Sequence, residues 1–362
     1  MKINFNALNI KLALTGLFLS YQAVGVSAQE DTLENADSSF KAPLVTESLL
    51  LDISHGSQTI IVGERGHILK ATNNSPEIDD FKQIIAPTRT TLTAVYNLGQ
   101  NVWAVGHDAT IIRSTDSGNS WELVQTFPEL DRPLLDVYFF DENEGIAIGA
   151  YGLFYRTLDG GMNWQQESHP SVLSEDDKEY LDSIKDDEAF YLEELSFISP
   201  HFNQLNFANG QLYLAGEAGL VAVSSDRGNN WERLDIDYFG SFFAINVLPS
   251  NEVMVAGLRG NMFVQSNDDW RKINTCVTTS LNSIEIDGSN AHLFGNNGVI
   301  LKVSLNQLNS SELQSTSIDG CRRHVSVSQT KTDFSDPIAD GIPTGSHLLT
   351  VTASGLKQVV AN

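Results

Sequence analysis

One short unit recurs along this chain: an apolar strand runs into Gly-x-x-Gly or a close variant, and a second apolar strand follows. Six copies begin at Gly63, Gly106, Gly149, Gly216, Gly257 and Gly295, and a degenerate seventh copy is Thr352-Ala353-Ser354-Gly355. The first glycines are spaced by 43, 43, 67, 41 and 38 residues. A period of about forty residues is typical of a propeller blade built from four short strands. The repeat therefore predicts an all-β, seven-bladed β-propeller, and by itself it implies no catalytic set.

A second motif, S/T-x-D-x-G-x-x-W, follows the third strand of three copies and is the Asp-box. Its aspartate can accept hydrogen bonds from the amides of its own turn, and its glycine takes a backbone conformation that a Cβ would oppose. Its tryptophan packs between sheets. We therefore assign a structural role, rather than a catalytic one, to Asp116, Gly118, Trp121, Asp159, Gly161, Trp164, Asp226, Gly228 and Trp231.

Three complete Asp-boxes, each preceded by a Gly-x-x-Gly turn, resemble the bacterial-neuraminidase-repeat propellers, and within them the photosystem II stability/assembly factor-like family. The resemblance covers about residues 45–360 and is clearest at 106–121 and 149–164. It implies the propeller fold. It also implies a role either in photosystem assembly or, in non-photosynthetic bacteria, among exported proteins that accompany membrane transporters.

Residues 1–28 have the features of a secretory signal, with Lys2 and Lys11, a short apolar core from Leu12 to Leu19, and a small-residue cleavage site ending at Ala28. The core is too short for a stable membrane-spanning helix, and a retained N-terminal anchor is the alternative. We expect a periplasmic or secreted protein whose residues 29–362 form one propeller domain. Cleavage changes the net charge from −24 to −26, because two lysines and no acids are removed. Such an acidic surface argues against nucleic-acid partners, although solubility or a salty medium explains the charge equally well.

Aligning the repeats places both cysteines in linkers that enter consecutive blades, and equivalent linkers of neighbouring blades lie side by side. We therefore predict a disulfide between Cys276 and Cys321, as suits an exported protein. No Cys/His spacing typical of a metal site occurs in the sequence, and we expect no metal and no cofactor.

Two insertions interrupt the repeat, whose strands are lettered a to d from the channel outward. Residues 171–195 are acidic and helical in pattern, with Ser174-Glu175-Asp176-Asp177 as a capping box. They lie in a d-to-a linker, on the face that carries the Gly-x-x-Gly turns, either as a passive flap or as a partner-docking element. Residues 331–346 are expected to form an a–b loop on the opposite face. The last copy lacks a d strand, and residues 40–45 resemble the d strand at 81–87, so we expect this N-terminal strand to close blade seven.

The b–c turns bring polar side chains toward one mouth of the channel, where they either bind a ligand or peptide or are simply solvated. The candidate binding residues are Arg65, His107, Asp108, Tyr151, Glu217 and Arg259. Protein interfaces favour Arg and Tyr as anchors, and Arg65, Tyr151 and Arg259 are therefore the expected contacts.

The function that fits best is a non-enzymatic scaffold that docks an exported domain of a membrane protein or transporter complex. The alternative is an Asp-box glycoside hydrolase, sialidase-like or glucanase-like. Sialidase resemblance implies an arginine cluster and a tyrosine nucleophile, but only Arg65 and Arg259 occupy matching turns, and an F/Y-R-I-P sequence is missing. Asp108 and Glu217 could imitate the two acids of other glycosidases.

Overall fold

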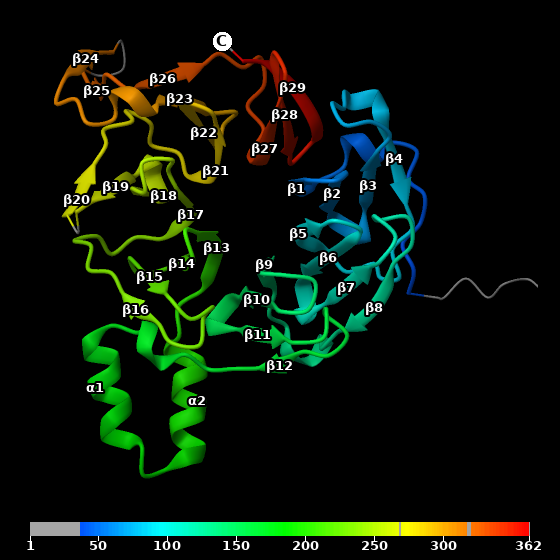
Figure 1. The fold of residues 1–362 in the computed structure, drawn as a ribbon, viewed down its shortest axis with the longest axis vertical. Coiled ribbons are helices and arrows are strands. Elements are labelled where there is room, and N and C mark those ends of the chain that lie inside the picture. Colours follow the sequence, from blue (N-terminus) through cyan, green and yellow to red (C-terminus); the bar gives the residue numbers. More distant parts are fainter. Residues whose placement is uncertain (1–36, 268, 317–319, 362) are drawn as a thin grey trace, which may run out of the picture. The chain divides into compact units, whose positions relative to one another are not determined.

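A computed structural model describes residues 37–267, 269–316 and 320–361. The predicted signal segment, residues 1–28, lies outside the described residues. Seven antiparallel sheets follow one another along the chain, and each innermost strand contacts the innermost strand of the next sheet. The ring closes where β27 contacts β1 (Figure 1). The predicted seven-bladed propeller is confirmed.

The first four blades each contain four strands joined by short turns. Blade one is β1 (Leu50–His55), β2 (Thr59–Gly63), β3 (Ile68–Ala71) and β4 (Phe81–Ile84). Blade two is β5 (Leu92–Leu98), β6 (Asn101–Gly106), β7 (Ile111–Ser114) and β8 (Glu122–Gln125). Blade three is β9 (Leu134–Phe139), β10 (Gly145–Gly149), β11 (Phe154–Thr157) and β12 (Gln165–Gln166). Blade four is β13 (Phe202–Ala208), β14 (Gln211–Gly216), β15 (Val221–Ser224) and β16 (Glu232–Arg233).

The last three blades are less regular. Blade five is β17 (Phe242–Val247), β18 (Val253–Gly257), β19 (Met262–Ser266) and β20 (Asp269–Lys272). Blade six is β21 (Leu281–Asp287), β22 (Asn290–Gly295), β23 (Ile300–Ser304) and β26 (Val327–Thr330), with a separate hairpin of β24 (Leu313–Ser315) and β25 (Arg322–His324) inserted before β26. Blade seven has three strands, β27 (Ile338–Thr344), β28 (His347–Thr352) and β29 (Gly355–Val360).

The hydrophobic core is divided into one cluster for each interface between neighbouring blades. Apolar residues of each sheet face the next, as in the cluster of blades two and three, where Trp103 stacks on Phe139 with ring centroids 3.4 Å apart. The indole Nε1 of Trp103 donates to the carbonyl of Gly160, 2.9 Å away. Because every blade needs both neighbours to bury its faces, the blades stabilise one another around the ring.

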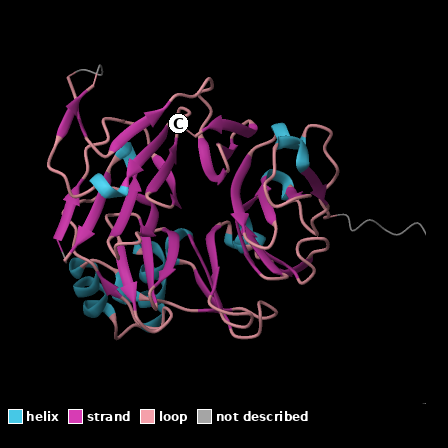
Figure 2. Ribbon diagram, turned by 45° about the horizontal axis from the view of Figure 1, so that its top comes forward, coloured by secondary structure: helices cyan, strands magenta, loops and turns pink. Residues whose placement is uncertain are grey.

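The insertion between blades three and four is a helical hairpin, as predicted. It consists of α1 (Glu175–Ile184) and α2 (Glu188–Ile198), set at one side of the ring of strands (Figure 2). Ser174 caps α1 by accepting from the amide of Asp177 at 3.2 Å. The hairpin has its own small core around Leu173, Leu181 and Leu195. Within the described residues, no helix is both long and apolar enough to cross a membrane.

The predicted closure of blade seven by residues 40–45 is wrong. The amide of Ser39 donates to the carbonyl of Ala86 at 2.9 Å, and the amide of Ala42 donates to Gln83 Oε1 at 2.8 Å, so this segment runs along blade one. A 3₁₀ turn, η1 (Val45–Glu47), then lies against β29 without adding a strand. Residues 40–45 resemble the d strand of blade one in sequence, and in the structure this segment lies along blade one rather than blade seven.

The predicted loop at 331–346 is also wrong, because residues 338–344 form β27, the innermost strand of blade seven. Residues 324–327 end β25 and begin β26 of blade six, so Cys321 does not precede the innermost strand of blade seven. Alternation of apolar residues does not distinguish an a strand from a d strand, and the extra hairpin shifted the count by one strand.

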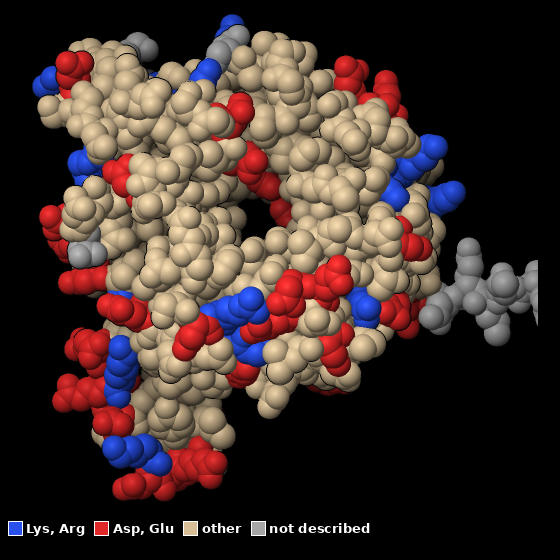
Figure 3. Space-filling model, in the orientation of Figure 1, with Lys and Arg blue, Asp and Glu red and all other residues tan. Residues whose placement is uncertain are grey.

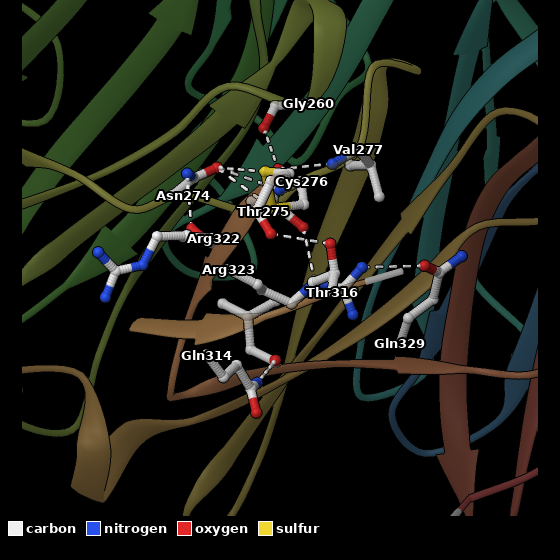
Figure 4. Close-up of a disulfide and its surroundings, with 12 residues drawn as sticks. Gly260, Asn274, Thr275, Cys276, Val277, Gln314, Thr316, Arg322, Arg323 and Gln329 are labelled. Carbon is white, nitrogen blue, oxygen red and sulfur yellow. Dashed lines mark hydrogen bonds between the residues drawn. A yellow bond between two sulfur atoms is a disulfide. The ribbon is translucent and has the colours of Figure 1, made fainter. Parts of the chain in front are cut away.

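Cys276 and Cys321 form the predicted disulfide, with their Cα atoms 5.9 Å apart (Figure 4). Cys276 lies in the linker that enters blade six, as expected. Cys321, however, belongs to the β24–β25 hairpin rather than to the linker entering blade seven. The bond therefore ties the hairpin to the linker. Arg323 strengthens this junction by donating from Nε to the carbonyl of Thr275 at 3.0 Å.

Candidate functional site

The b–c turns have one shared geometry that projects their second residue into solvent. That residue has a left-handed backbone in Arg65 (φ 55°), Asp108 (φ 57°), Tyr151 (φ 53°) and Arg259 (φ 58°). The amide of the preceding residue donates to the carbonyl just before the innermost strand, as from His107 to Thr91 at 3.0 Å. Left-handed non-glycine residues are costly, so the repeated strain is held by the fold in blade after blade.

A glycine ends the b–c turns of blades one, three, four, five and six, and Ala109 stands at this position in blade two. A Cβ on Gly66 would lie 2.1 Å from the carbonyl oxygen of Thr88, and one on Gly219 would lie 1.8 Å from that of Tyr238. These carbonyls belong to the linkers that enter the next blade. Each turn is therefore packed against the neighbouring linker, and turns and d-to-a linkers together form one surface, here called the turn face.

The structure places the six predicted binding residues on the turns of different blades. Arg65, His107, Tyr151 and Arg259 are exposed. Glu217 instead holds the entry to blade four, because its Oε2 accepts from the amide of His201 at 3.2 Å and its Oε1 lies 3.5 Å from His201 Nδ1. The ring of His201 also contacts the Tyr151 ring edge-on, at 4.6 Å between centroids. Tyr151 and Glu217 are thus connected through His201.

Tyr151 borders a groove of about 200 Å³ between blade three and helix α2. The guanidinium carbon of Arg132, from the linker entering blade three, lies 4.8 Å from the centroid of the Tyr151 ring. Opposite them, α2 contributes Leu192, Leu195 and Ser196. The groove thus combines an Arg–Tyr pair with apolar helix side chains, and it places the helical insertion beside a turn, as the sequence predicted.

The floor of this groove carries a histidine and a carboxylate that are already engaged. His169 Nε2 lies 3.2 Å from Glu167 Oε2, and burial lowers the pKa of His169 although the carboxylate opposes this shift. Arg156 Nε donates to Glu167 Oε1 at 2.8 Å. A histidine held neutral and a carboxylate neutralised by arginine suit recognition by hydrogen bonds and shape.

Helix α2 exposes apolar side chains on two of its faces. Leu192, which lines the groove, is 51% exposed. Phe190 and Phe197 are 41% and 77% exposed, on the side of the helix that points away from the groove. In Figure 3 the α2 side of the hairpin is largely free of charged atoms, whereas acidic atoms gather along the α1 side and at the tip. Exposed apolar side chains rimmed by polar residues are typical of interaction sites. We call this groove, with the exposed Leu192 in its lining, the α2 groove.

The Asp-box carboxylates accept hydrogen bonds from donors within their own turns. Asp159 Oδ1 accepts from the amides of Met162 and Asn163 at 3.0 and 2.9 Å, and Asn163 Nδ2 donates to Oδ2 at 2.7 Å. In blade two, hydrogen bonds led by the Ser120 hydroxyl lower the pKa of Asp116 to about 2. The glycines of the three boxes have φ between 79° and 85°. This geometry matches the structural role predicted for the motif.

In the described part of the chain, Asp108 and Glu217, the two acids suggested for a glycosidase, do not lie on the same turn. Asp108 lies in blade two and Glu217 in blade four, with blade three between them. Arg65 and Arg259 lie in blades one and five. Among the residues that the structure describes, no group of three His, Cys, Asp or Glu side chains is arranged to hold a metal ion.

The central channel contains half-buried acids that the sequence analysis missed. Asp52 and Asp136, from the innermost strands of blades one and three, accept the amides of Val95 and Leu205 in the next blades, both at 2.7 Å. Burial raises the pKa of Asp136 to about 7, and burial with the nearby Asp340 carboxyl raises that of Asp52 well above its ordinary value. Acidic atoms are visible around the central opening in Figure 3. These acids bond blade to blade, and their equivalent positions in the repeat were the signal available in the sequence.

Arg132 and the apolar side chains of α2 were also missed as candidate contacts. Arg132 stands in a d-to-a linker, and the rule that such linkers share a face with the b–c turns was sufficient to place it there. The exposure of Leu192 had no comparable signal, because α2 is apolar around most of its circumference and periodicity does not indicate which side packs.

Comparison with known proteins gives a consistent result. The profile of the family described as photosynthesis system II assembly factor YCF48 matches residues 53–152 and 125–239, which together span 187 of the 362 residues. The photosystem II assembly lipoprotein Ycf48 of Synechococcus sp. (strain CC9902) is 27% identical over 47% of this chain and 44% of its own length. The photosystem II stability/assembly factor HCF136, chloroplastic, of Arabidopsis thaliana is 23% identical over 47% of this chain and 39% of its own length. The chain thus matches less than half the length of these relatives.

Two solved structures share the fold over nearly the whole chain. The structure titled YCF48 bound to D1 peptide has a TM-score of 0.60 and 14% identity, and covers 90% of this chain and 97% of that one. YCF48 from Cyanidioschyzon merolae has a TM-score of 0.59 and 15% identity, over 90% and 99%. Together with the family profile, the repeated turns and the Asp-boxes, these matches show that the chain belongs to the photosynthesis system II assembly factor YCF48 family.

Proposed function

We propose that this protein is a non-enzymatic scaffold that assists a membrane protein complex by binding one of its extracytoplasmic segments in the α2 groove. The observation that carries the proposal is the juxtaposition of the Arg132–Tyr151 pair with the exposed Leu192 of α2 in one groove. Aromatic and arginine anchors beside apolar surface are the usual centre of a protein interface.

The relatives support this role. They are named as assembly factors, one of them is named as a lipoprotein, and one structure is titled as bound to a D1 peptide. Export of the present chain, to the periplasm or medium, rests on the signal-like residues 1–28. The finer proposal, that an exported domain of a membrane or transporter complex is the partner, rests on this export together with the position of the groove. The turns bearing Arg65, His107, Asp108 and Arg259 would form the outer part of the same surface.

Affinity purification from detergent-solubilised native membranes, followed by quantitative mass spectrometry, tests the proposal. The double variant Tyr151→Ala/Leu192→Ser removes the aromatic anchor of the groove and the exposed apolar side chain that α2 contributes to its lining. The matched control is Leu158→Ala/Met162→Ala, because these side chains are 71% and 57% exposed in the Asp-box of the same blade, away from the groove. We expect one membrane protein to be enriched by the native chain and the control, and lost from the groove variant.

A second variant, Arg65→Ala/Arg259→Ala, measures how far the contact extends around the turn face. Equal recovery of the membrane protein by the native chain and the Tyr151→Ala/Leu192→Ser variant would contradict the proposal. Turnover of a sialoside or β-glucan by the purified protein, abolished by Asp108→Asn or Glu217→Gln, would replace it with hydrolysis.

A further inference from the structure

Within the described residues, blade seven has three strands, whereas each of the other six blades has four. In those blades an outer strand of two to four residues pairs antiparallel with the third strand. In blade seven, β29 is the outermost strand and is six residues long. Short outer strands limit edge-to-edge pairing, whereas a longer edge is a template for another strand.

Alternate residues of β29 direct their backbone groups away from the sheet. The amide of Ala361 donates to the carbonyl of Ser346 at 2.9 Å, which fixes the phase of the pairing. The backbone N–H and C=O groups of residues at odd positions therefore point toward β28. Those of Leu356, Gln358 and Val360 point away from β28. Within the described residues, β29 pairs with β28 alone.

A groove of about 440 Å³ adjoins this edge. It is lined by Gln358, Val359 and Val360 of β29 and by Lys331, Thr332 and Asp333 of the linker from blade six. Val360 is 55% exposed. Because Lys331 and Asp333 offset each other, the groove is locally neutral on a chain with a net charge of −24, and it suits an uncharged segment with an apolar side chain against Val360.

Two alternative occupants are disfavoured by the structure. The chain's own residues 39–42 are hydrogen-bonded along blade one, through Ala86 and Gln83, and η1 contacts β29 near Gly355 without pairing with it. A second copy would bring two strongly acidic chains together, and their mutual repulsion opposes such pairing.

We propose that the open edge of β29 binds an extended, uncharged segment of a partner protein by strand addition. The segment runs antiparallel to β29 over about four residues, as the outer strands of the other blades do, and it completes blade seven. This site is separate from the α2 groove and does not depend on the proposed function.

Site-specific photo-crosslinking of the full chain in its native cells tests the inference. The photoreactive residue p-benzoylphenylalanine replaces Val360, and mass spectrometry identifies the crosslinked peptide. We expect a partner segment that is extended and uncharged. Gln358→Pro removes an outward amide without touching the β28 ladder, and should abolish the crosslink. Tyr151→Ala/Leu192→Ser should retain it, which separates this site from the α2 groove.

A synthetic peptide with the crosslinked sequence then provides a direct measurement. Hydrogen exchange at the amides of Leu356, Gln358 and Val360 should slow at least tenfold on addition of the peptide. If Gln358→Pro fails to fold, Val360→Asp is used in this exchange measurement instead, since it alters the groove and leaves the backbone intact, and the peptide should then not slow exchange at Gln358. A crosslink to residues 29–36 of the same chain, a crosslink to a second copy, no crosslink, or unchanged exchange would each overturn the inference.

Discussion

At the scale of single residues, the half-buried channel acids make stability depend on pH in an unusual direction. Asp136 has a folded-state pKa of about 7, raised by burial, against an ordinary value of 3.8. The fold therefore favours the protonated acid. The stabilisation that comes from protonated Asp136 is fully present below about pH 4. It is lost as the pH rises through about 7, which lowers the free energy of unfolding by on the order of 2–4 kcal/mol.

Asp136→Asn tests this assignment, because the amide keeps an oxygen for Leu205 and cannot ionise. We expect the free energy of unfolding of the variant to fall less than that of the native protein between pH 5 and pH 8, in denaturant titrations at each pH. Some dependence should remain, since Glu285 has a pKa raised to about 8 by burial. Identical slopes for the two proteins would show that Asp136 does not titrate in this range.

The Asp-box aspartates give the opposite dependence. Hydrogen bonds led by that from Asn230 lower the pKa of Asp226 to about 2. This contribution is present above about pH 4 and is lost as the pH falls toward 2. Asp159→Ala, which leaves several turn donors unpaired, should lower the free energy of unfolding at pH 7 by roughly 1–3 kcal/mol. Partner recovery should be unchanged, whereas its loss in a folded variant would assign Asp159 a place in the interface.

At the scale of elements, the disulfide joins two segments that no strand pairing connects. Cys276→Ser/Cys321→Ser opens a loop with a sequence separation of 45 residues. The expected loss is about 2–4 kcal/mol in the free energy of unfolding. Denaturant titration with and without reductant measures it, and the double variant should be insensitive to reductant. A native protein whose stability does not respond to reductant would contradict a stabilising role.

The helical hairpin packs around its own cluster, apart from the seven clusters between blades. Replacing residues 175–198 by a short Gly-Ser linker should leave the propeller folded, with a Tm within a few degrees of the native value, and should remove partner binding. Circular dichroism and calorimetry check the fold. Loss of the cooperative transition would instead place the hairpin inside the folding unit of the propeller.

The sequence predicted the regular elements and failed where the repeat was broken. The turns, the Asp-boxes and the capped helix at Ser174 follow from local backbone chemistry, so short motifs were sufficient for them. The strand assignment at 324–346 failed because apolar alternation is the same in inner and outer strands. The disulfide pairing was right although Cys321 lies in an unpredicted hairpin, since either location brings it near the linker of Cys276.

At the scale of the whole molecule, the site was predicted less well than the fold. Strand direction alone predicted that the b–c turns and the helical insertion share one face. Tyr151 was then selected on that face because tyrosine is a favoured interface anchor. Arg132 and the exposed side of α2 required three-dimensional packing, because which face of an apolar helix is covered depends on its neighbours. The six turn residues lie on separate blades, and only their positions around the ring determine which of them can share a partner.

The central claim is that the α2 groove binds an extracytoplasmic segment of a membrane protein. Its most direct test is a fluorescence anisotropy titration of purified protein against the segment recovered by affinity purification. Loss of two interface anchors, each worth about 1–2 kcal/mol or more, predicts a Kd at least 30-fold higher for Tyr151→Ala/Leu192→Ser. The Leu158→Ala/Met162→Ala control should bind like the native protein. Equal Kd values for the native protein and the groove variant would contradict the account.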